Sequence, residues 1–162
     1  MAFWRQLTPK DIEGLVLVAD VVHPGLLERD VVFAERARLF PEGCLVLEED
    51  SRVCGYVISH PIRYSQPPAL DTLLGELASD ADQFYIHDVC VLPDLRGCGY
   101  AVDVVKKLLA IAERYPTTCL VSVYGTAPFW VRFGFRPPDH APSDTMRGYG
   151  DDAVYLERHN GN

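Results

Sequence analysis

The sequence has no long hydrophobic run, no paired-cysteine motif and no excess of basic residues. Its apolar runs are short: Leu15–Ala19, for example, ends at once in Asp20, whereas a membrane-spanning helix needs ~20 apolar residues. The first residues, MAFWRQLTPKD, hold no basic segment that leads into an apolar one, which predicts that there is no signal peptide. These absences predict a cytoplasmic protein with no membrane partner.

Cysteine occurs five times, and no two cysteines form a CxxC pair. The positions are Cys44, Cys54, Cys90, Cys98 and Cys119. Each lies in an apolar or glycine-rich setting, where a reduced thiol behaves as a small hydrophobic group. No group of Cys and His has the spacing of zinc ligands. We therefore expect free cysteines and no metal site.

Basic residues are in deficit, with 15 Lys and Arg against 23 Asp and Glu and a formal net charge of −8. A nucleic-acid surface requires clustered Lys and Arg, so we expect no nucleic-acid partner. An acidic surface concentrates positive ligands and is compatible with a cationic amine substrate. Hydrophobic residues are plentiful, at 48% of 162 residues, which predicts one packed domain over residues 1–162.

Apolar periodicity predicts a mixed α/β domain with the order β-α-α-β-β-β-α-β-α-β-β, which has about seven strands and four helices. The assigned strands are Phe3–Leu7, Cys44–Leu47, Arg52–His60, Phe84–Val91, Thr118–Tyr124 and Ala153–Glu157. The helices are expected from Thr8 to about Val22, over Glu28–Phe40, from Tyr100 to about Tyr115, and over Pro128–Phe133. Ala69–Asp82 reads as a loop with one helical turn at most, on the substrate side.

A glycine-rich turn joins the strand over 84–91 to the longest helix. Gly97 and Gly99 permit φ values closed to other residues and a close approach of the backbone to a ligand. The first N–H groups of the helix lack intrahelical acceptors, and the helix dipole adds positive charge. This turn therefore predicts a phosphate or pyrophosphate site. The turn is not a Walker A loop, because the Gly-Lys-Ser/Thr ending is missing. It also does not match a Rossmann fingerprint, because Val102 stands at the position of the third glycine.

Two segments resemble motifs of one family. Residues 91–101, VLPDLRGCGYA, resemble the central motif V-x-P-x-x-R-G-x-G-x-A/G of the GNAT superfamily of acetyl-CoA-dependent N-acetyltransferases. Residues 127–135, APFWVRFGF, are similar to the family's short helix that ends in G-F. The element order also fits, so the resemblance covers essentially the whole chain. It implies a central mixed sheet that splays apart between its fourth and fifth strands.

The resemblance implies that acetyl-CoA is the cosubstrate, with no metal. The pantetheine arm would bond to the backbone of Val89–Val91 like an added strand, and one N–H there would polarise the thioester carbonyl. The amides of Arg96–Ala101 would hold the pyrophosphate, Phe129 would flank the arm, and Arg132 is a weaker candidate for phosphate contact. The implied cofactor-binding residues are Val89, Cys90, Val91, Arg96, Gly97, Cys98, Gly99, Tyr100, Ala101, Phe129 and Arg132.

The implied reaction is direct attack of a primary amine on acetyl-CoA in a ternary complex. An alkylamine is mostly protonated at neutral pH and must lose a proton, whereas a thiolate departs with little help. The predicted base is His87, which by alternation shares a face of its strand with Tyr85 and Val89, while Asp88 lies on the other face. A bulge near Val89 would bring in Asp88 instead. The alternative for His87 is a half-buried side chain that bonds to backbone.

The family often has a tyrosine in the short helix that protonates the departing sulfur. Trp130 stands at that position, and its indole cannot serve as an acid. Tyr124, at the end of the neighbouring strand, is the predicted substitute, with ordinary packing as its alternative. The remaining histidines next to prolines, His23, His60 and His140, are expected to face solvent.

Alternatives to an amine acetyltransferase remain open. An acyl-CoA-binding sensor with little catalysis is supported only by Trp130, and an enzyme that acetylates aminoacyl-tRNA is disfavoured by the charge of −8. The acceptor could be a small amine, an amino acid, an antibiotic, or a protein N-terminus or lysine. Acceptor specificity is expected in the loops 61–82 and 137–150. A homodimer is common in the family, and no feature of this sequence fixes it.

Overall fold

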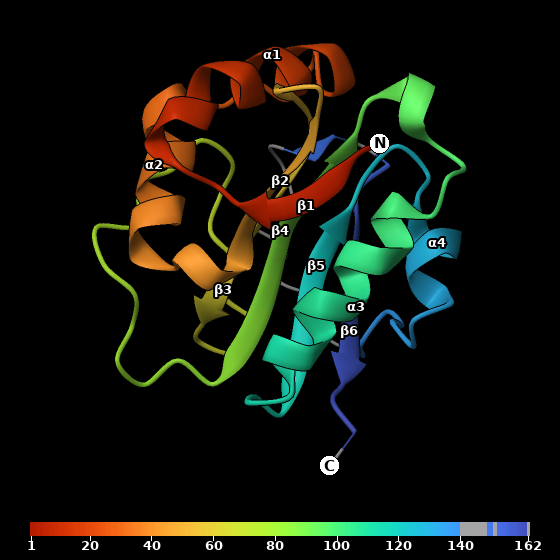
Figure 1. Cartoon of the computed structure of the whole chain (residues 1–162). Coiled ribbons are helices and arrows are strands. Elements are labelled where there is room, and N and C mark those ends of the chain that lie inside the picture. The colour runs from red at the N-terminus through yellow and green to blue at the C-terminus, as the bar shows by residue number, and fades with distance from the viewer. Residues whose placement is uncertain (140–148, 151, 162) are drawn as a thin grey trace.

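A computed structural model describes residues 1–139, 149–150 and 152–161. Its centre is a six-stranded sheet in the order β1-β2-β3-β4-β5-β6, in which only β4 and β5 run parallel (Figure 1). The strands are β1 (Phe3–Gln6), β2 (Cys44–Glu49), β3 (Arg52–Ile62), β4 (Gln83–Val91), β5 (Thr117–Ser122) and β6 (Val154–His159). The helices are α1 (Ile12–Val22), α2 (Asp30–Leu39), α3 (Tyr100–Ala112) and α4 (Ala127–Val131).

The helices cover both faces of the sheet (Figure 1). Because side chains alternate along a strand, β3 contributes to two separate cores. Tyr56 and Ile58 pack with α1 and α2, whereas Val57 packs with α3 and α4. No helix within the described ranges is both long and apolar enough to cross a membrane. The mixed α/β architecture predicted from the sequence is confirmed.

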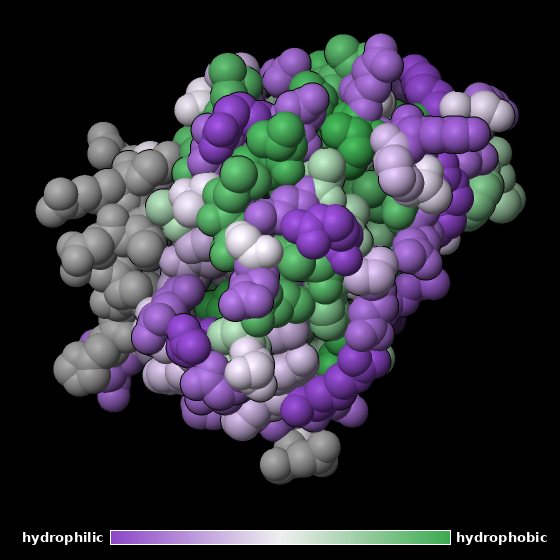
Figure 2. All heavy atoms as spheres, turned by 90° about the vertical axis from the view of Figure 1, so that its left-hand side faces the viewer, coloured by the Kyte–Doolittle hydropathy of each residue, from purple (hydrophilic) through white to green (hydrophobic). Residues whose placement is uncertain are grey.

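Figure 2 shows the side of the molecule on which α1 and α2 lie, where apolar and polar side chains are interspersed. The exposed apolar residues of α1, α2 and their connection are Leu17, Val21, Leu27 and Val31. The outer surface of this helix pair therefore presents scattered apolar groups rather than a purely charged face.

Two local expectations differ from the structure. The strand expected between α4 and β6 is reduced, in the described residues, to an isolated bridge between Arg136 and Glu157. His60 does not face solvent from a loop, because β3 continues through it to Ile62 and buries it completely. The segment 69–82 is a loop without a helix, as expected.

The fourth and fifth strands separate halfway along their length. Parallel pairing runs from Gln83 with Thr117 to Ile86 with Leu120 and then stops. At this point β4 also carries a bulge towards β3: Asp88 pairs with Ile58 and Ile86 with Ser59, so that His87 is the extra residue. The predicted splay is confirmed, and the part of β4 beyond Ile86 has no strand partner on its β5 side among the described residues.

Candidate active site

A cavity of about 550 Å³ lies where β4 and β5 separate. Its walls come from the second half of β4, the end of β5 with the turn after it, Phe129 and Trp130 of α4, and the connection between α1 and α2. Apolar lining residues include Val89, Val91, Val121, Phe129 and Trp130. The polar groups His23, Glu28, His87, Asp88 and Tyr124 also line it. The cavity is thus apolar along its walls, with a cluster of ionisable groups.

The glycine turn lies at one margin of this cavity, where Arg96 and Ala101 are part of the lining. Gly97 and Gly99 have φ of +80° and +86°, and a Cβ at either position would meet no atom within 4 Å. Gly99 is the N-cap of α3, which begins at Tyr100. The space in front of the free N–H groups of this helix is therefore open to an anion. Arg96 donates from Nε to the carbonyl oxygen of Val91 at 3.1 Å, which ties the turn to the end of β4.

The short helix α4 forms the opposite wall. Phe129 and Trp130 line the cavity, and Trp130 is largely buried, with its ring edge-on to Phe129 and Phe135. Arg132 is exposed and does not belong to the cavity lining; its guanidinium lies 5.8 Å from the centre of the Phe129 ring. Trp130 therefore forms part of the cavity wall, and its indole cannot serve there as an acid.

The bulge of β4 changes which side chains point into the site. The expectation that His87 and Asp88 face opposite sides of the sheet is wrong: both reach residues of the α1–α2 connection, His87 to Glu28 and Asp88 to His23. The physical reason is that the extra residue at His87 interrupts the alternation. Val89 consequently packs with the core on the α3 side.

His87 and Glu28 form a buried pair. Nε2 of His87 lies 2.7 Å from Oε1 of Glu28, and Nδ1 lies 2.9 Å from the hydroxyl of Tyr85. The two paired side chains are only 2% and 3% exposed. Burial alone would raise the pKa of Glu28, but the charge and hydrogen bond of His87 and the amide of Asp71 outweigh it, and the pKa is lowered. Among the described residues the His87 ring bonds to side chains, not to backbone.

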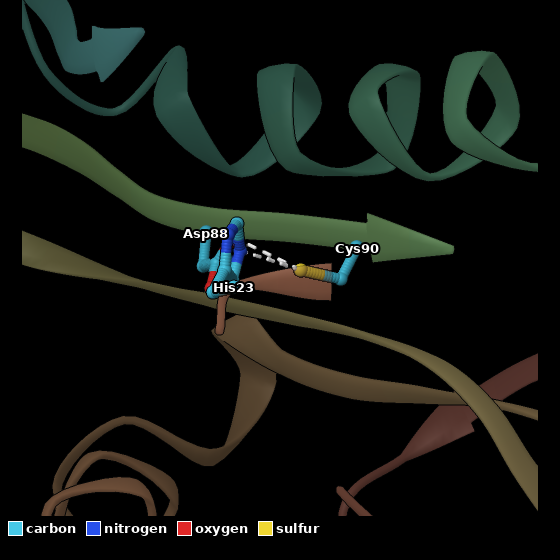
Figure 3. A group of neighbouring side chains, drawn as sticks. All are labelled: His23, Asp88 and Cys90. Atoms are coloured by element: carbon cyan, nitrogen blue, oxygen red, sulfur yellow. Dashed lines mark hydrogen bonds and ion pairs between the residues drawn. The ribbon is translucent and has the colours of Figure 1, made fainter. Parts of the chain in front are cut away.

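His23 and Asp88 form a second pair beside the first. Nε2 of His23 lies 3.0 Å from Oδ1 of Asp88 and 3.0 Å from the Sγ of Cys90 (Figure 3). Tyr56 donates its hydroxyl to Oδ2 of Asp88 at 2.6 Å. Burial acts to lower the pKa of His23, yet the hydrogen bond and charge of Asp88 raise it overall. Burial likewise acts to raise the pKa of Asp88, but His23 lowers it overall. Both shifts favour the charged pair.

The placement of His23 corrects a further expectation. Its side chain is 12% exposed, because it ends α1 directly over the sheet instead of facing solvent. Tyr124 stacks on its ring, with centroids 5.4 Å apart, and the Tyr124 hydroxyl lies 3.2 Å from Nδ1. Tyr124 has φ of +56°, an uncommon value for a residue other than glycine. The structure thus brings the predicted residue Tyr124 into the site.

Sequence reasoning missed Glu28, His23 and Tyr149. The hydroxyl of Tyr149 lies 3.2 Å from that of Tyr85 and donates to the Pro68 carbonyl at 3.1 Å, which joins two loops over the site. Glu28 and His23 are close in sequence, flanking the short segment PGLL. A carboxylate and an imidazole in one short connection between two helices were the signal in the sequence that could have indicated a site. His140 and most of the loop 137–150 lie outside the described residues.

The sequence matches the acetyltransferase (GNAT) family over residues 14–135. The chain belongs to the acetyltransferase (GNAT) family. The protein is therefore an acyltransferase. No curated protein sequence gives a significant match.

Solved structures with the same fold cover nearly the whole chain. Ard1 from Thermoplasma volcanium is 16% identical, with 99% of each chain covered and a TM-score of 0.74. The loading GNATL domain of CurA from Lyngbya majuscula is 13% identical, with 98% of each chain covered and a TM-score of 0.81. Naa50 from Arabidopsis thaliana, in complex with the bisubstrate analogue CoA-Ac-MVNAL, is 14% identical, with 97% of each chain covered and a TM-score of 0.68. At these identities the likeness is one of fold.

Proposed function

We propose that the protein transfers the acetyl group of acetyl-CoA to a primary amine by direct attack in a ternary complex. The observation that carries this proposal is the second half of β4, which has no strand partner on its β5 side among the described residues. This segment runs along a cavity from the glycine turn to two histidine–carboxylate pairs. Membership of the GNAT family and the likeness in fold to Naa50, which was solved in complex with the bisubstrate analogue CoA-Ac-MVNAL, support it.

The residues of the cavity fit acetyl-CoA. The backbone of Val89–Val91 has no strand partner towards β5, and a pantetheine arm can bond there as an added strand. The open turn at Gly97 and Gly99 can hold the pyrophosphate on backbone N–H groups, and Phe129 offers an apolar wall to the arm. When bound, acetyl-CoA supplies an activated thioester.

The buried Glu28–His87 pair is the proposed proton acceptor. An incoming ammonium group must lose a proton before it can attack, and Glu28 and His87 both line the cavity. If the Tyr85 hydroxyl donates to Nδ1, the neutral His87 ring carries its proton on Nε2 and donates this hydrogen bond to the ionised carboxylate of Glu28. The carboxylates of Glu28 and Asp88, both with lowered pKa, also attract a cationic acceptor.

Tyr124 is the proposed proton donor to the departing thiolate. It follows β5 on the other arm of the splay, lines the cavity and carries its hydroxyl beside His23. Trp130 occupies the family's usual tyrosine position and has no acidic proton to give. The proposed donor and acceptor thus come from opposite walls of one cavity.

The proposal is tested first by calorimetric titration of acetyl-CoA and CoA into the wild type and into Gly99→Asp. A negatively charged side chain in the open turn should weaken binding by about 100-fold or more, because it repels the pyrophosphate and removes the glycine conformation. Gly75→Asp is the matched control, since Gly75 also has a positive φ and open space but lies outside the cavity lining. Failure of the wild type to bind either ligand would overturn the proposal.

Turnover with a panel of primary amines, followed by mass spectrometry of the acetylated products, tests the chemical step. We expect Glu28→Gln to lower kcat by about 10²- to 10⁴-fold, the usual contribution of a general base, with unchanged affinity for acetyl-CoA. Tight binding of acetyl-CoA with no amine acetylated would instead support the sensor hypothesis.

A further inference from the structure

We propose that His23, Asp88 and Cys90 form a zinc-binding site. Their donor atoms are Nε2, Oδ1 and Sγ, and Figure 3 shows the three side chains as neighbours, with dashed lines leading to the Cys90 sulfur. The three separations are 3.0 Å from Nε2 to Oδ1, 3.0 Å from Nε2 to Sγ and 3.2 Å from Sγ to Oδ1. This site was not expected from the sequence, and binding of the metal does not depend on the acetyl-transfer proposal.

The spacing of the donors is close to that of tetrahedral zinc ligands. Zinc–ligand bonds of about 2.0 to 2.3 Å place neighbouring ligand atoms about 3.3 to 3.6 Å apart. The observed separations of 3.0 to 3.2 Å are shorter by a few tenths of an ångström. Hydrogen bonds already hold the same atoms close together, so the site needs only a small expansion.

Two tyrosines orient the ligands from outside. Tyr56 donates to Oδ2 of Asp88 at 2.6 Å, which leaves Oδ1 turned towards the other donors. The Tyr124 hydroxyl lies 3.2 Å from Nδ1 of His23, which leaves Nε2 as the inward nitrogen. Such outer hydrogen bonds on a histidine and a carboxylate are a regular feature of zinc sites. Here both the histidine and the carboxylate have such a bond.

The donor set selects zinc over hard cations. Thiolate and imidazole ligands suit Zn²⁺, whereas Mg²⁺ and Ca²⁺ prefer oxygen ligands alone. His23, Asp88 and Cys90 all line the cavity, so a fourth coordination position faces open space, as in zinc sites that keep one place for water or a ligand. On binding, the Cys90 thiol gives up its proton to solvent and sulfur becomes a thiolate ligand.

Titration with Co²⁺, a spectroscopic substitute for Zn²⁺, tests this site directly. We expect one equivalent to give a thiolate-to-cobalt charge-transfer band together with the visible bands of tetrahedral Co²⁺, and Zn²⁺ to displace it. Cys90→Ser should abolish the charge-transfer band and weaken binding by about 100-fold or more. Tyr56→Phe, which removes only the outer hydrogen bond on Asp88, should weaken it by about 10-fold.

Cys98→Ser is the matched control, because Cys98 is the exposed cysteine of the chain and lies apart from the cluster. It should keep both the stoichiometry and the spectrum. His23→Gln provides a second test if Cys90→Ser does not fold, as judged by circular dichroism. The site would be refuted if folded wild type bound no Co²⁺, if the charge-transfer band persisted in Cys90→Ser, or if Cys98→Ser lost it.

Discussion

Acid should weaken the fold through one buried imidazole, that of His60. Its side chain has no exposed surface, Nδ1 donates to the Pro61 carbonyl oxygen at 3.1 Å, and Nε2 has no hydrogen-bond partner among the described residues. Burial, opposed in part by the Pro61 bond and reinforced by Arg36 and His87, lowers the pKa of His60 from 6.5 to about 3. His60 is therefore neutral in the folded protein.

The sign and size of the effect follow from proton linkage. In the unfolded chain His60 takes up a proton as the pH falls below 6.5, whereas the folded protein does not do so until about pH 3. Between these values the unfolded state binds more protons, so the free energy of unfolding falls as the pH falls. The loss attributable to His60 is about 1 to 2 kcal/mol near pH 5.5 and about 2 to 3 kcal/mol near pH 4.5.

Urea unfolding followed by circular dichroism measures this contribution. The wild type, His60→Gln and His159→Gln should be compared between about pH 7.5 and about pH 4.5, where the linkage acts. We expect the free energy of unfolding of His60→Gln to fall less steeply with acid than that of the wild type, by the amounts above. His159 is exposed, so its variant should follow the wild type. An equally steep decline in His60→Gln would refute the reasoning.

Two further substitutions test the packing and the chemistry of the site. Gly55→Ala should lower the free energy of unfolding by about 1 to 3 kcal/mol, measured in urea, because its Cβ would lie 2.6 Å from the carbonyl oxygen of Cys90. Gly25→Ala is the control and should not lower it, since the space around its Cβ is open. Equal losses in the two variants would contradict this reasoning. In a CoA-release assay, Tyr124→Phe should lower kcat by about 10- to 100-fold with an unchanged KM for acetyl-CoA. The kcat of Trp130→Phe should stay within about twofold of the wild-type value. An unchanged kcat in Tyr124→Phe would rule out Tyr124 as the proton donor.

The fold could be predicted from the sequence because each helix and strand carries its own apolar periodicity and its own start and end residues. The inward residues of α3, such as Val105 and Leu108, recur at helical spacing, and the glycine turn before it marks the start of the helix. Prediction from local patterns failed for the strand expected between α4 and β6. Pro137 and Pro138 follow Arg136 and offer no N–H groups, so only the Arg136 bridge to Glu157 can form.

The site could be predicted only in part, because its contacts join distant parts of the chain. His87 and Tyr124 are recognisable by their strands, but the partner of His87, Glu28, lies 59 residues away in sequence. The zinc ligands have the same difficulty: His23 is 65 residues from Asp88, and no ligand spacing within one segment reveals it. Such pairs depend on where α1 ends over the sheet, which no local pattern specifies.

One extra residue in β4 determines how these groups meet. In an unbroken strand Asp88 would point with Ile86 towards α3, away from His23. The bulge at His87 turns Asp88 and Cys90 to the side of the α1–α2 connection while His87 keeps its own contact with Glu28. The same irregularity coincides with the end of pairing to β5, which opens the cavity. The polar pairs, the candidate metal ligands and the cavity proposed to bind acetyl-CoA thus share a single structural cause. A substitution that removed the bulge would disturb all three together.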